Sequence, residues 1–379
     1  MLAPQRSFTF RTAIAVIAIL QLALEAPARA DDGAFLTRFR TVLTVASTVP
    51  ANGDVNPYGI VLVHRTVGEL RRGSVLVSNF NNAANLQGTG TTIVQIDPDG
   101  RVGLFAQIDP AKLGGECPGG VGLTTALTVL ERGWVIVGSL PSSTGLAENA
   151  GAGCLIVLDA RGAVVETFHG KGINGPWDMT ARDDGAEAHL FVSNVLNGNV
   201  TSGSPHVVNE GTVIRIGLEV PEQGYGVPRR VSTTVIGSDF AEKADPAAFV
   251  IGPTGVGLSW DGTLYVADTF NNRIAEIPDA LTRKAAVPTA MTVSQGGSLN
   301  GPLGLTIAPN GNILTTNGGD GNVVETTPRG KQVAVKTIDT VTGAGSLFGL
   351  AVAPGGLGLF FVDDGDNTLK ALCADRQCF

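Results

Sequence analysis

The sequence contains a repeated pattern, and in each unit a polar residue stands at the end of an apolar stretch. One further carboxylate, Asp178, lies near the start of an apolar stretch in the third unit. The recurring residues are Asn79, Ser139, Asn194, Asp268, Asn317 and Asp363. Carboxylate and amide oxygens are the ligands that a hard cation such as Ca²⁺ requires. If these side chains converge, Asn194 and Asp268 are the first candidates for metal ligands. The alternative is that each side chain caps the turn that follows it.

The histidines are scattered over the first three units and do not show the spacing of a zinc site. They are His64, His169, His189 and His206. Only His206 falls in a long stretch rich in Gly, Asn and Ser, from which it can approach the recurring polar positions. The candidate ligand-binding residues are therefore Asn79, Asp178, Asn194, His206, Asp268, Asn317 and Asp363.

A repeat carries these polar positions, and it is clearest in Gly252–Ile277, which reads GPTGVGLSWDGTLYVADTFNNRIAEI. An apolar strand follows Pro-x-Gly, an Asp-Gly turn reverses the chain, and the second strand ends in Asp268. Roughly 45 residues per unit allow four short strands, which is the size of a propeller blade. The sequence therefore predicts an all-β protein, a six-bladed β-propeller. Its units span about 56–108, 117–170, 173–237, 250–297, 300–341 and 347–373.

The pattern resembles the repeat of the NHL family, which forms β-propellers, and the match is closest in Pro253–Ile274. The chain is also similar, more distantly, to the gluconolactonase-like six-bladed propellers. That second resemblance implies a divalent metal held by Glu, Asn and Asp at the mouth of the central channel, with the Glu in an early E-G-P-x-W segment. Here Asn56–Gly59 reads NPYG and Asn174–Asp178 reads NGPWD, so neither segment carries the glutamate.

A ring of such units assigns each connection to a face. With the strands of a blade named a to d from the centre outward, the b–c connections share a face with the start of strand a. The last unit lacks a fourth strand, and Arg38–Val49 alternates like one. We therefore expect Arg38–Val49 to pair with Thr368–Cys373, which closes the ring and hides an exposed edge. A short helix is expected in the connector that contains Asp239 and Asp245.

The b–c connections differ in length between the two halves of the chain. They are short in the last three units and long in the first three, at Asn79–Thr91, Ser139–Gly153 and Asn194–Gly211. Long loops in compact domains tend to be functional, although the alternative is that these are tolerated insertions. We therefore predict a scaffold that binds a protein, peptide or saccharide on this face. The alternative function is a metal-dependent, lactonase-like hydrolase or lyase with Ca²⁺ or another divalent cation at the channel mouth.

The N-terminus has the features of a secretory signal peptide spanning residues 1–30. Arg6 and Arg11 precede an apolar run, Ile14–Leu24, and Ala28–Ala30 gives a small-x-small cleavage site. Its removal changes the net charge from −8 to −10, because the segment carries three arginines and one glutamate. An acidic surface disfavours nucleic acid and anionic membranes as partners. We expect residues 31–379 to be a single exported domain, periplasmic or extracellular, without a membrane span; an uncleaved anchor is the alternative.

Four cysteines in an exported chain predict two disulfides. Cys117 and Cys154 precede strands a and c of the second unit on one face, whereas Cys373 and Cys378 lie at the end of the last unit and in the tail. We therefore expect the pairs Cys117–Cys154 and Cys373–Cys378. Strands a and c lie about 10 Å apart, but loop on either side of the first pair allows the gap to close.

Overall fold

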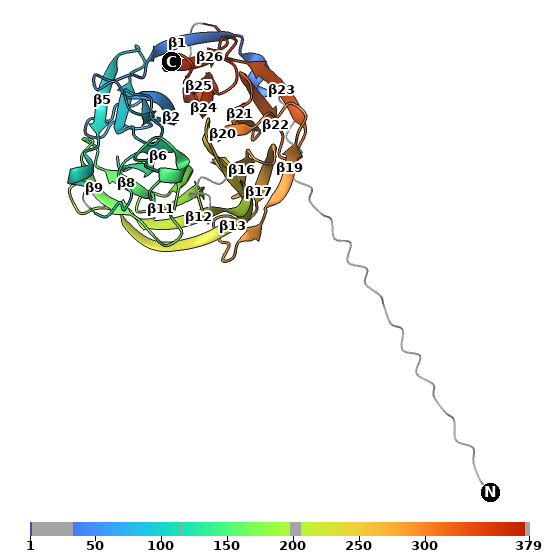
Figure 1. Cartoon of the computed structure of the whole chain (residues 1–379). Helices are drawn as coiled ribbons and strands as arrows, with labels where there is room; N and C mark the ends of the chain where they lie inside the picture. Colours follow the sequence, from blue (N-terminus) through green and yellow to red (C-terminus); the bar gives the residue numbers. More distant parts are fainter. Residues whose placement is uncertain (2–32, 114, 198–205, 376–379) are drawn as a thin grey trace. The chain divides into compact units, whose positions relative to one another are not determined.

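Six sheets surround a central axis in the computed structural model of the chain (Figure 1). The structure describes residue 1 and residues 33–113, 115–197 and 206–375. Residues 33–379 form one unit, and the description below concerns this unit alone. The prediction of an all-β, six-bladed β-propeller is confirmed. The predicted signal peptide lies outside the described residues.

The first three blades are antiparallel meanders that run from the axis outward. Blade 1 contains β2 (Val55–Leu62), β3 (Val75–Asn81), β4 (Thr92–Ile96) and β5 (Val102–Gln107). Blade 2 contains β6 (Leu123–Val129), β7 (Val135–Ser139), β8 (Cys154–Leu158) and β9 (Val164–Phe168). Blade 3 contains β10 (Pro176–Asp183), β11 (Glu187–Asn194), β12 (Val208–Glu219), β13 (Arg229–Asp245) and β14 (Phe249–Ile251), and β18 (Val287–Pro288) pairs with β13.

The last three blades follow the same plan. Blade 4 contains β15 (Pro253–Leu258), β16 (Leu264–Asp268), β17 (Arg273–Ile277) and β19 (Met291–Gln295). Blade 5 contains β20 (Pro302–Ile307), β21 (Ile313–Asn317), β22 (Asn322–Thr326) and β23 (Gln332–Thr337). Blade 6 contains β24 (Leu347–Val352), β25 (Gly358–Asp363), β26 (Thr368–Cys373) and β1 (Thr41–Ser47). The 3₁₀ turns are η1 (Phe35–Arg38), η2 (Pro110–Lys112), η3 (Ala147–Asn149) and η5 (Pro354–Gly356).

The segment that precedes blade 1 is tied to the end of the chain. Strand β1 pairs antiparallel with β26, from Thr41 opposite Cys373 to Ser47 opposite Thr368, and Figure 1 shows the two strands side by side. Before β1, the buried carboxylate of Glu325 accepts hydrogen bonds from the backbone N–H groups of Phe35 and Leu36, both at 2.8 Å. A buried acid on β22 therefore holds η1 against blade 5.

Strand β13 occupies the region around Asp239 and Asp245 in which a short helix was expected. The strand continues to Asp245 and then forms a hairpin with β14, in which Ala244 lies opposite Val250. The turn forms because Asp245 accepts hydrogen bonds from the N–H groups of Ala247 and Ala248, both at 3.0 Å. The expectation of a helix was therefore wrong, because strand pairing and this turn satisfy the backbone instead.

The glycine of the Pro-x-Gly motif lets the inner strands of neighbouring blades approach each other. A Cβ atom added to Gly255, Gly304 or Gly349 would lie 2.3, 2.1 and 2.4 Å from a backbone oxygen of the next blade. Each strand a also has a register shift against strand b at this point, which is typical of a β-bulge. At this position of blades 4 to 6, the backbone of the next blade is too close for any side chain.

Hydroxyl groups tie adjacent inner strands together. In blades 1, 3 and 5 the hydroxyl sits on strand b, one residue before the recurring polar position: Ser78, Ser193 and Thr316. The Ser193 hydroxyl accepts a hydrogen bond from the N–H of Asp178 at 3.1 Å and donates to the carbonyl oxygen of Thr254 in blade 4 at 2.6 Å. In blade 2 a threonine on strand a does this instead, since Thr124 donates to a carbonyl oxygen of blade 3 at 2.8 Å.

The disulfide between Cys117 and Cys154 is confirmed, with their Cα atoms 5.3 Å apart. Cys117 lies in the loop before β6, and this loop brings it beside Cys154 at the start of β8. The disulfide therefore forms although β6 and β8 are not adjacent strands. The predicted partner of Cys373, Cys378, lies outside the described residues, and that pairing stays a prediction. In the part of the chain that the structure describes, no helix has the length and apolar character needed to cross a bilayer.

Candidate functional site in the central channel

The inner strands of all six blades line a cavity of about 500 Å³ on the axis of the ring. The wall from blades 2 and 3 is rich in polar groups such as Thr125 and Asp178, whereas the inner strands of blades 1 and 4 to 6 contribute largely aliphatic surface. His64, Glu131 and Asp183 line the cavity at the ends of the inner strands or in the connections that follow them. The cavity therefore extends toward the face of the a–b connections.

Aromatic side chains fill the axis at the other end of the channel. The ring of Tyr58 stacks on Phe348, with ring centroids 3.9 Å apart, and on Phe80, at 4.6 Å, while Trp177 meets Tyr58 edge-on at 5.7 Å. Tyr58, Trp177 and Phe348 come from the starts of β2, β10 and β24, so blades 1, 3 and 6 meet across the axis. Burial raises the pKa of Tyr58 above its usual range. The channel is thus closed on the face of the b–c connections.

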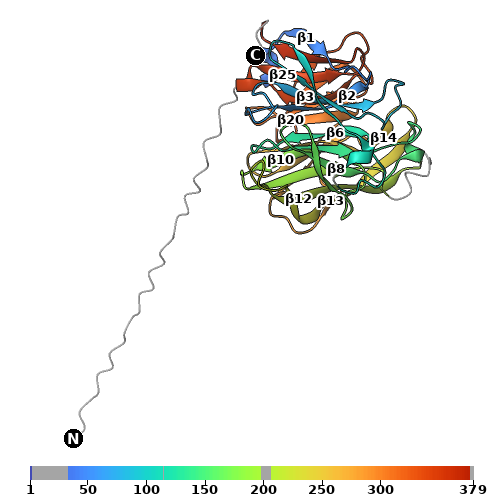
Figure 2. The same cartoon turned by 90° about the vertical axis from the view of Figure 1, so that its left-hand side faces the viewer.

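The long connections of blades 1 to 3 pack over this aromatic cluster. The N–H of Ser142, after β7, donates to the carbonyl oxygen of Gly88, after β3, at 2.8 Å. The Gln87 amide donates to the carbonyl oxygen of Ala247, between β13 and β14, at 3.3 Å. Figure 2 shows β14 on one side of the ring with these connections. Because the space beneath the described connections is filled by side chains, the structure gives no support to the expected ligand site there.

Asp178 lies at the inner end of the cavity, on β10, and only 8% of its surface is exposed. Its carboxylate accepts a hydrogen bond from the N–H of Val256, on β15, at 2.9 Å. Burial raises the pKa of Asp178 to about 7, although hydrogen bonds from the N–H groups of Val256 and Met179 act in the opposite direction. Near neutral pH this carboxyl can therefore exchange a proton readily, as a general acid or base must.

The repeat explains why Asp178 faces the channel. Asp178 follows Pro176-Trp177, so it occupies the position that is glycine in Pro253–Gly255 and Pro302–Gly304. A side chain at this position is directed at the inner strand of the next blade, and the contact with Val256 shows this. In blade 2 the same position is Thr125, which also lines the cavity. The sequence signal for the site was therefore a departure from Pro-x-Gly in adjacent blades.

A second, small pocket adjoins Asp178 on the side of the aromatic cluster. It has a volume of about 10 Å³, close to the space that one water molecule needs. Thr125, Asp178 and Thr254 supply its polar side chains, and Trp177 and Phe348 close it. The arrangement can place a single water molecule against the carboxyl group, away from bulk solvent.

The other predicted positions lie at the ends of the second strands, where they are buried and bonded within the protein. The Asn79 amide donates to the carbonyl oxygen of Thr48 at 3.0 Å. The amide oxygens of Asn194 and Asn317 accept from the backbone N–H groups of Asn174 and Asn300, both at 3.1 Å. None of these side chains lines the channel cavity. These three contacts reach segments that precede the strand, whereas Asp268 and Asp363 accept hydrogen bonds from the N–H groups of Asn271 and Gly365 in the turns that follow them, as the turn-capping alternative expects. A role in ligand binding stays a prediction.

The carboxylates at these positions are paired with cations. Asp268 receives the Arg273 guanidinium at 2.7 Å, and Asp363 receives the Lys370 ammonium at 2.6 Å, with all four side chains largely buried. A metal held by Asn194 and Asp268 would have to displace Arg273 from Asp268 and the N–H of Asn174 from Asn194. The described residues also contain no cluster of three or more His, Cys, Asp or Glu suited to a metal. The residues present do not fit the divalent cation that the gluconolactonase-like resemblance implies.

His206 is exposed and precedes β12 by two residues. It does not line the channel cavity, so the structure does not bring it together with Asp178. Of the predicted ligand-binding residues, only Asp178 lines the cavity. Thr125 and the opening at the a–b face were not predicted from the sequence.

The chain resembles enzymes and a calcium-binding protein in fold. It superimposes on a gluconolactonase from Xanthomonas campestris with a TM-score of 0.53 and 14% identity, covering 88% of this chain and 89% of that one. A luciferin-regenerating enzyme gives 0.54 and 11%, with 88% and 95% covered. Regucalcin, a calcium-binding protein from Agrobacterium tumefaciens, gives 0.53 and 14%, with 86% and 92% covered.

Comparison at the level of sequence adds no closer relationship. No family model matches the chain, and no curated protein matches it in sequence. Membership of the NHL-repeat family therefore stays a prediction. At 11 to 14% identity, the structural similarity shows a fold shared with gluconolactonase-like six-bladed propellers.

Proposed function

We propose that the protein is a hydrolase of lactone or ester bonds in small molecules, with Asp178 as its general acid and base. The observation that carries the proposal is a buried carboxyl group, its pKa raised to about 7, at the inner end of a cavity of about 500 Å³. A cavity of this size suits a small organic ligand. A gluconolactonase among the structural neighbours acts in the same reaction class.

The reaction requires one proton to move to Asp178 and back. The carboxylate accepts a proton from a water molecule as the water oxygen bonds to the acyl carbon. The acyl carbon–oxygen bond then breaks, and the leaving oxygen takes the proton from the carboxylic acid, which restores the carboxylate. The small pocket beside Asp178 holds the water, and the aliphatic wall formed by Val256 and Leu305 excludes bulk solvent.

No step of this reaction uses a metal ion, because the donors that the gluconolactonase-like resemblance assigns are already engaged. Asp268 forms an ion pair with Arg273, and the Asn194 amide oxygen accepts a hydrogen bond from the N–H of Asn174. The proposal therefore departs from the metal-dependent form of the predicted alternative and keeps its reaction class.

We also infer that the protein is exported and that its ring is closed by the N-terminal strand. The predicted signal peptide and the disulfide between Cys117 and Cys154 support export, since disulfides persist in oxidising compartments. The pairing of β1 with β26 supports the closure. A periplasmic or extracellular location follows from this inference.

Hydrolysis of γ- and δ-lactones and of p-nitrophenyl esters by the purified protein tests the proposed function. The value of kcat/KM should rise with pH through an inflection near 7, because the carboxylate is the active form. Asp178→Asn should lower kcat/KM about 100-fold or more, and EDTA should leave the rate unchanged.

Asp364→Asn is the matched control for this experiment. Burial, and then the neighbouring charge of Asp363, raise the pKa of Asp364 to about 6, but Asp364 does not line the channel cavity. Its replacement should leave kcat/KM as it is. If no lactone or ester is hydrolysed, or if Asp178→Asn keeps full activity, the proposed function is wrong.

A further inference from the structure

A second cavity opens beside the channel, between blades 1 and 6. It has a volume of about 440 Å³, and its lining combines apolar groups with two basic side chains. Leu62, Val63 and Val352 provide apolar surface, and His64 and Arg72 provide the basic groups. We call this cavity the vestibule.

The vestibule continues into the channel. Leu62, His64 and Val352 line both cavities, so the two share a wall at the a–b face. A molecule that enters the channel through the vestibule passes Arg72 on its way to Asp178.

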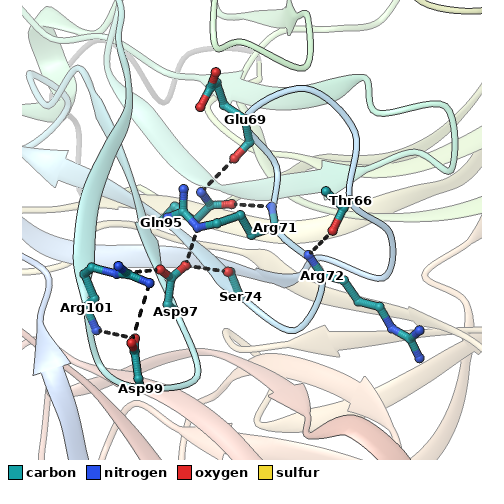
Figure 3. Close-up of polar contacts among 9 residues, drawn as sticks. All are labelled: Thr66, Glu69, Arg71, Arg72, Ser74, Gln95, Asp97, Asp99 and Arg101. Carbon is teal, nitrogen blue, oxygen red and sulfur yellow. Dashed lines mark hydrogen bonds and ion pairs between the residues drawn. The ribbon is translucent and has the colours of Figure 1, made fainter.

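Two consecutive arginines in the β2–β3 connection have different environments, as Figure 3 shows. The Arg71 guanidinium is bound to the Asp97 carboxylate at 2.6 Å, and Asp97 also receives Ser74 at 2.8 Å and Arg101 at 3.1 Å. The Arg72 side chain points away from this network. Within the described residues, its guanidinium has no ion pair or hydrogen bond, and the side chain is exposed.

The backbone that carries Arg72 is held in place by its neighbours. The Gln95 side chain accepts from the N–H of Arg71 and donates to the carbonyl oxygen of Glu69, both at 3.0 Å. The Thr66 hydroxyl accepts from the N–H of Arg72 at 3.0 Å. The guanidinium is therefore presented from a fixed loop, which reduces the entropy lost on binding.

Charge gives the vestibule its selectivity. The chain has a net charge of −8, yet the loop from Val63 to Ser74 contains three arginines and a single glutamate. An arginine without a partner, at the rim of an otherwise acidic protein, attracts anions, and its planar guanidinium matches a carboxylate. The apolar surface beside it requires a ligand that is also partly apolar.

We propose that the vestibule binds the carboxylate of an amphiphilic small molecule, with Arg72 as the anchoring residue and the apolar part directed into the channel. The proposal rests on the proposed function, since it makes the substrate a lactone or ester that carries a free carboxylate. In the channel, the apolar part would contact the aliphatic residues of blades 1 and 4 to 6, opposite the polar residues of blades 2 and 3.

Isothermal titration calorimetry with phenylacetate and hexanoate, and with phenylacetamide and hexanol as neutral counterparts, tests the vestibule without turnover. The acids should bind and the neutral compounds should bind more weakly. Arg72→Gln should weaken binding of the acids about tenfold or more, the loss of one charge-assisted contact. Arg72→Lys should give an intermediate affinity, because it keeps the charge and loses the fork of donors.

Arg65→Gln is the matched control, because it removes the same charge from the same loop and Arg65 does not line the vestibule. The affinity of the Arg65→Gln variant for the acids should equal that of the wild type. Equal affinities for acids and neutral compounds, equal losses in Arg65→Gln and Arg72→Gln, or no binding of either acid would each overturn the proposal. The same titration on Asp178→Asn separates the two proposals, since acid binding there should persist even if the hydrolase assignment fails.

Discussion

Asp178→Asn should remove a pH-dependent loss of stability that burial of this carboxyl imposes on the wild type. The pKa of Asp178 is 3.8 in the absence of the fold and about 7 within it, because burial disfavours the charged form. A raised folded pKa means that the contribution of the group to stability is fully present below 3.8 and is lost as the pH rises toward 7. The two values differ by about 3, and one pH unit corresponds to about 1.36 kcal/mol, so the loss is about 4 kcal/mol.

Urea unfolding of the wild type and Asp178→Asn, between about pH 4 and pH 8, measures this loss. The asparagine stays neutral, so the wild-type free energy of unfolding minus that of the variant should fall by about 4 kcal/mol across this range. Burial also raises the pKa of Glu242, to about 8, and of Asp364, to about 6, but both groups are present in both proteins and cancel in the difference. Parallel curves would show that Asp178 ionises as it does in water and would refute the buried environment on which the site depends.

Asp97 supplies a control of opposite sign. Burial acts to raise its pKa, but hydrogen bonds from Arg71 and Ser74 and the charge of Arg71 outweigh burial and lower it. The stability that Asp97 contributes is therefore present above its unfolded pKa and is lost as the pH falls through the folded value. Asp97→Asn should be less stable than the wild type at neutral pH, and the gap should narrow in acid.

Two further substitutions test contacts that hold the ring together. Glu325→Ala should lower the free energy of unfolding by about 3 to 5 kcal/mol, because it leaves the N–H groups of Phe35 and Leu36 and two asparagine amides without their acceptor. Limited proteolysis should then release the N-terminal segment, and its retention would contradict the role given to this carboxylate. Ser193→Ala should lower the free energy of unfolding by about 1 to 3 kcal/mol, measured by urea unfolding, because the N–H of Asp178 and the carbonyl oxygen of Thr254 both lose a hydrogen-bond partner. An unchanged midpoint and slope would show that the hydroxyl does not link blades 3 and 4.

The sequence predicts the blades well because each one is specified locally. An Asp-Gly turn such as Asp261-Gly262 and the alternation around it set one hairpin, and repetition sets the ring. The Cys117–Cys154 disulfide follows from the same layout, since Cys117 precedes β6 and Cys154 begins β8 on the same face. The turn-capping alternative for the recurring polar positions is also local, because Asp268 bonds Asn271 and Arg273, three and five residues away.

The closed end of the channel could not be predicted in this way. Tyr58, Trp177 and Phe348 belong to three blades, and their contacts depend on how the ring brings the inner strands together. The end of β13 was predicted as a helix for a related reason. Its conformation is fixed by pairing with β14 and by the turn at Asp245 rather than by the intrinsic propensity of its residues. Long-range packing decided both cases.

The position of Asp178 shows where chemistry enters a repeat of this kind. A side chain at the end of strand b lies one strand away from the axis, about 4.8 Å further out, and finds its partners within the blade, as Asp268 does. The glycine position of strand a lies at the axis itself, and most blades exclude a side chain there because the neighbouring backbone is too close. A blade that carries a carboxylate at this position must direct it at the next inner strand, into the channel and out of solvent. Departure from the repeat at that position is therefore a stronger signal for a site than the polar residues that recur in every blade.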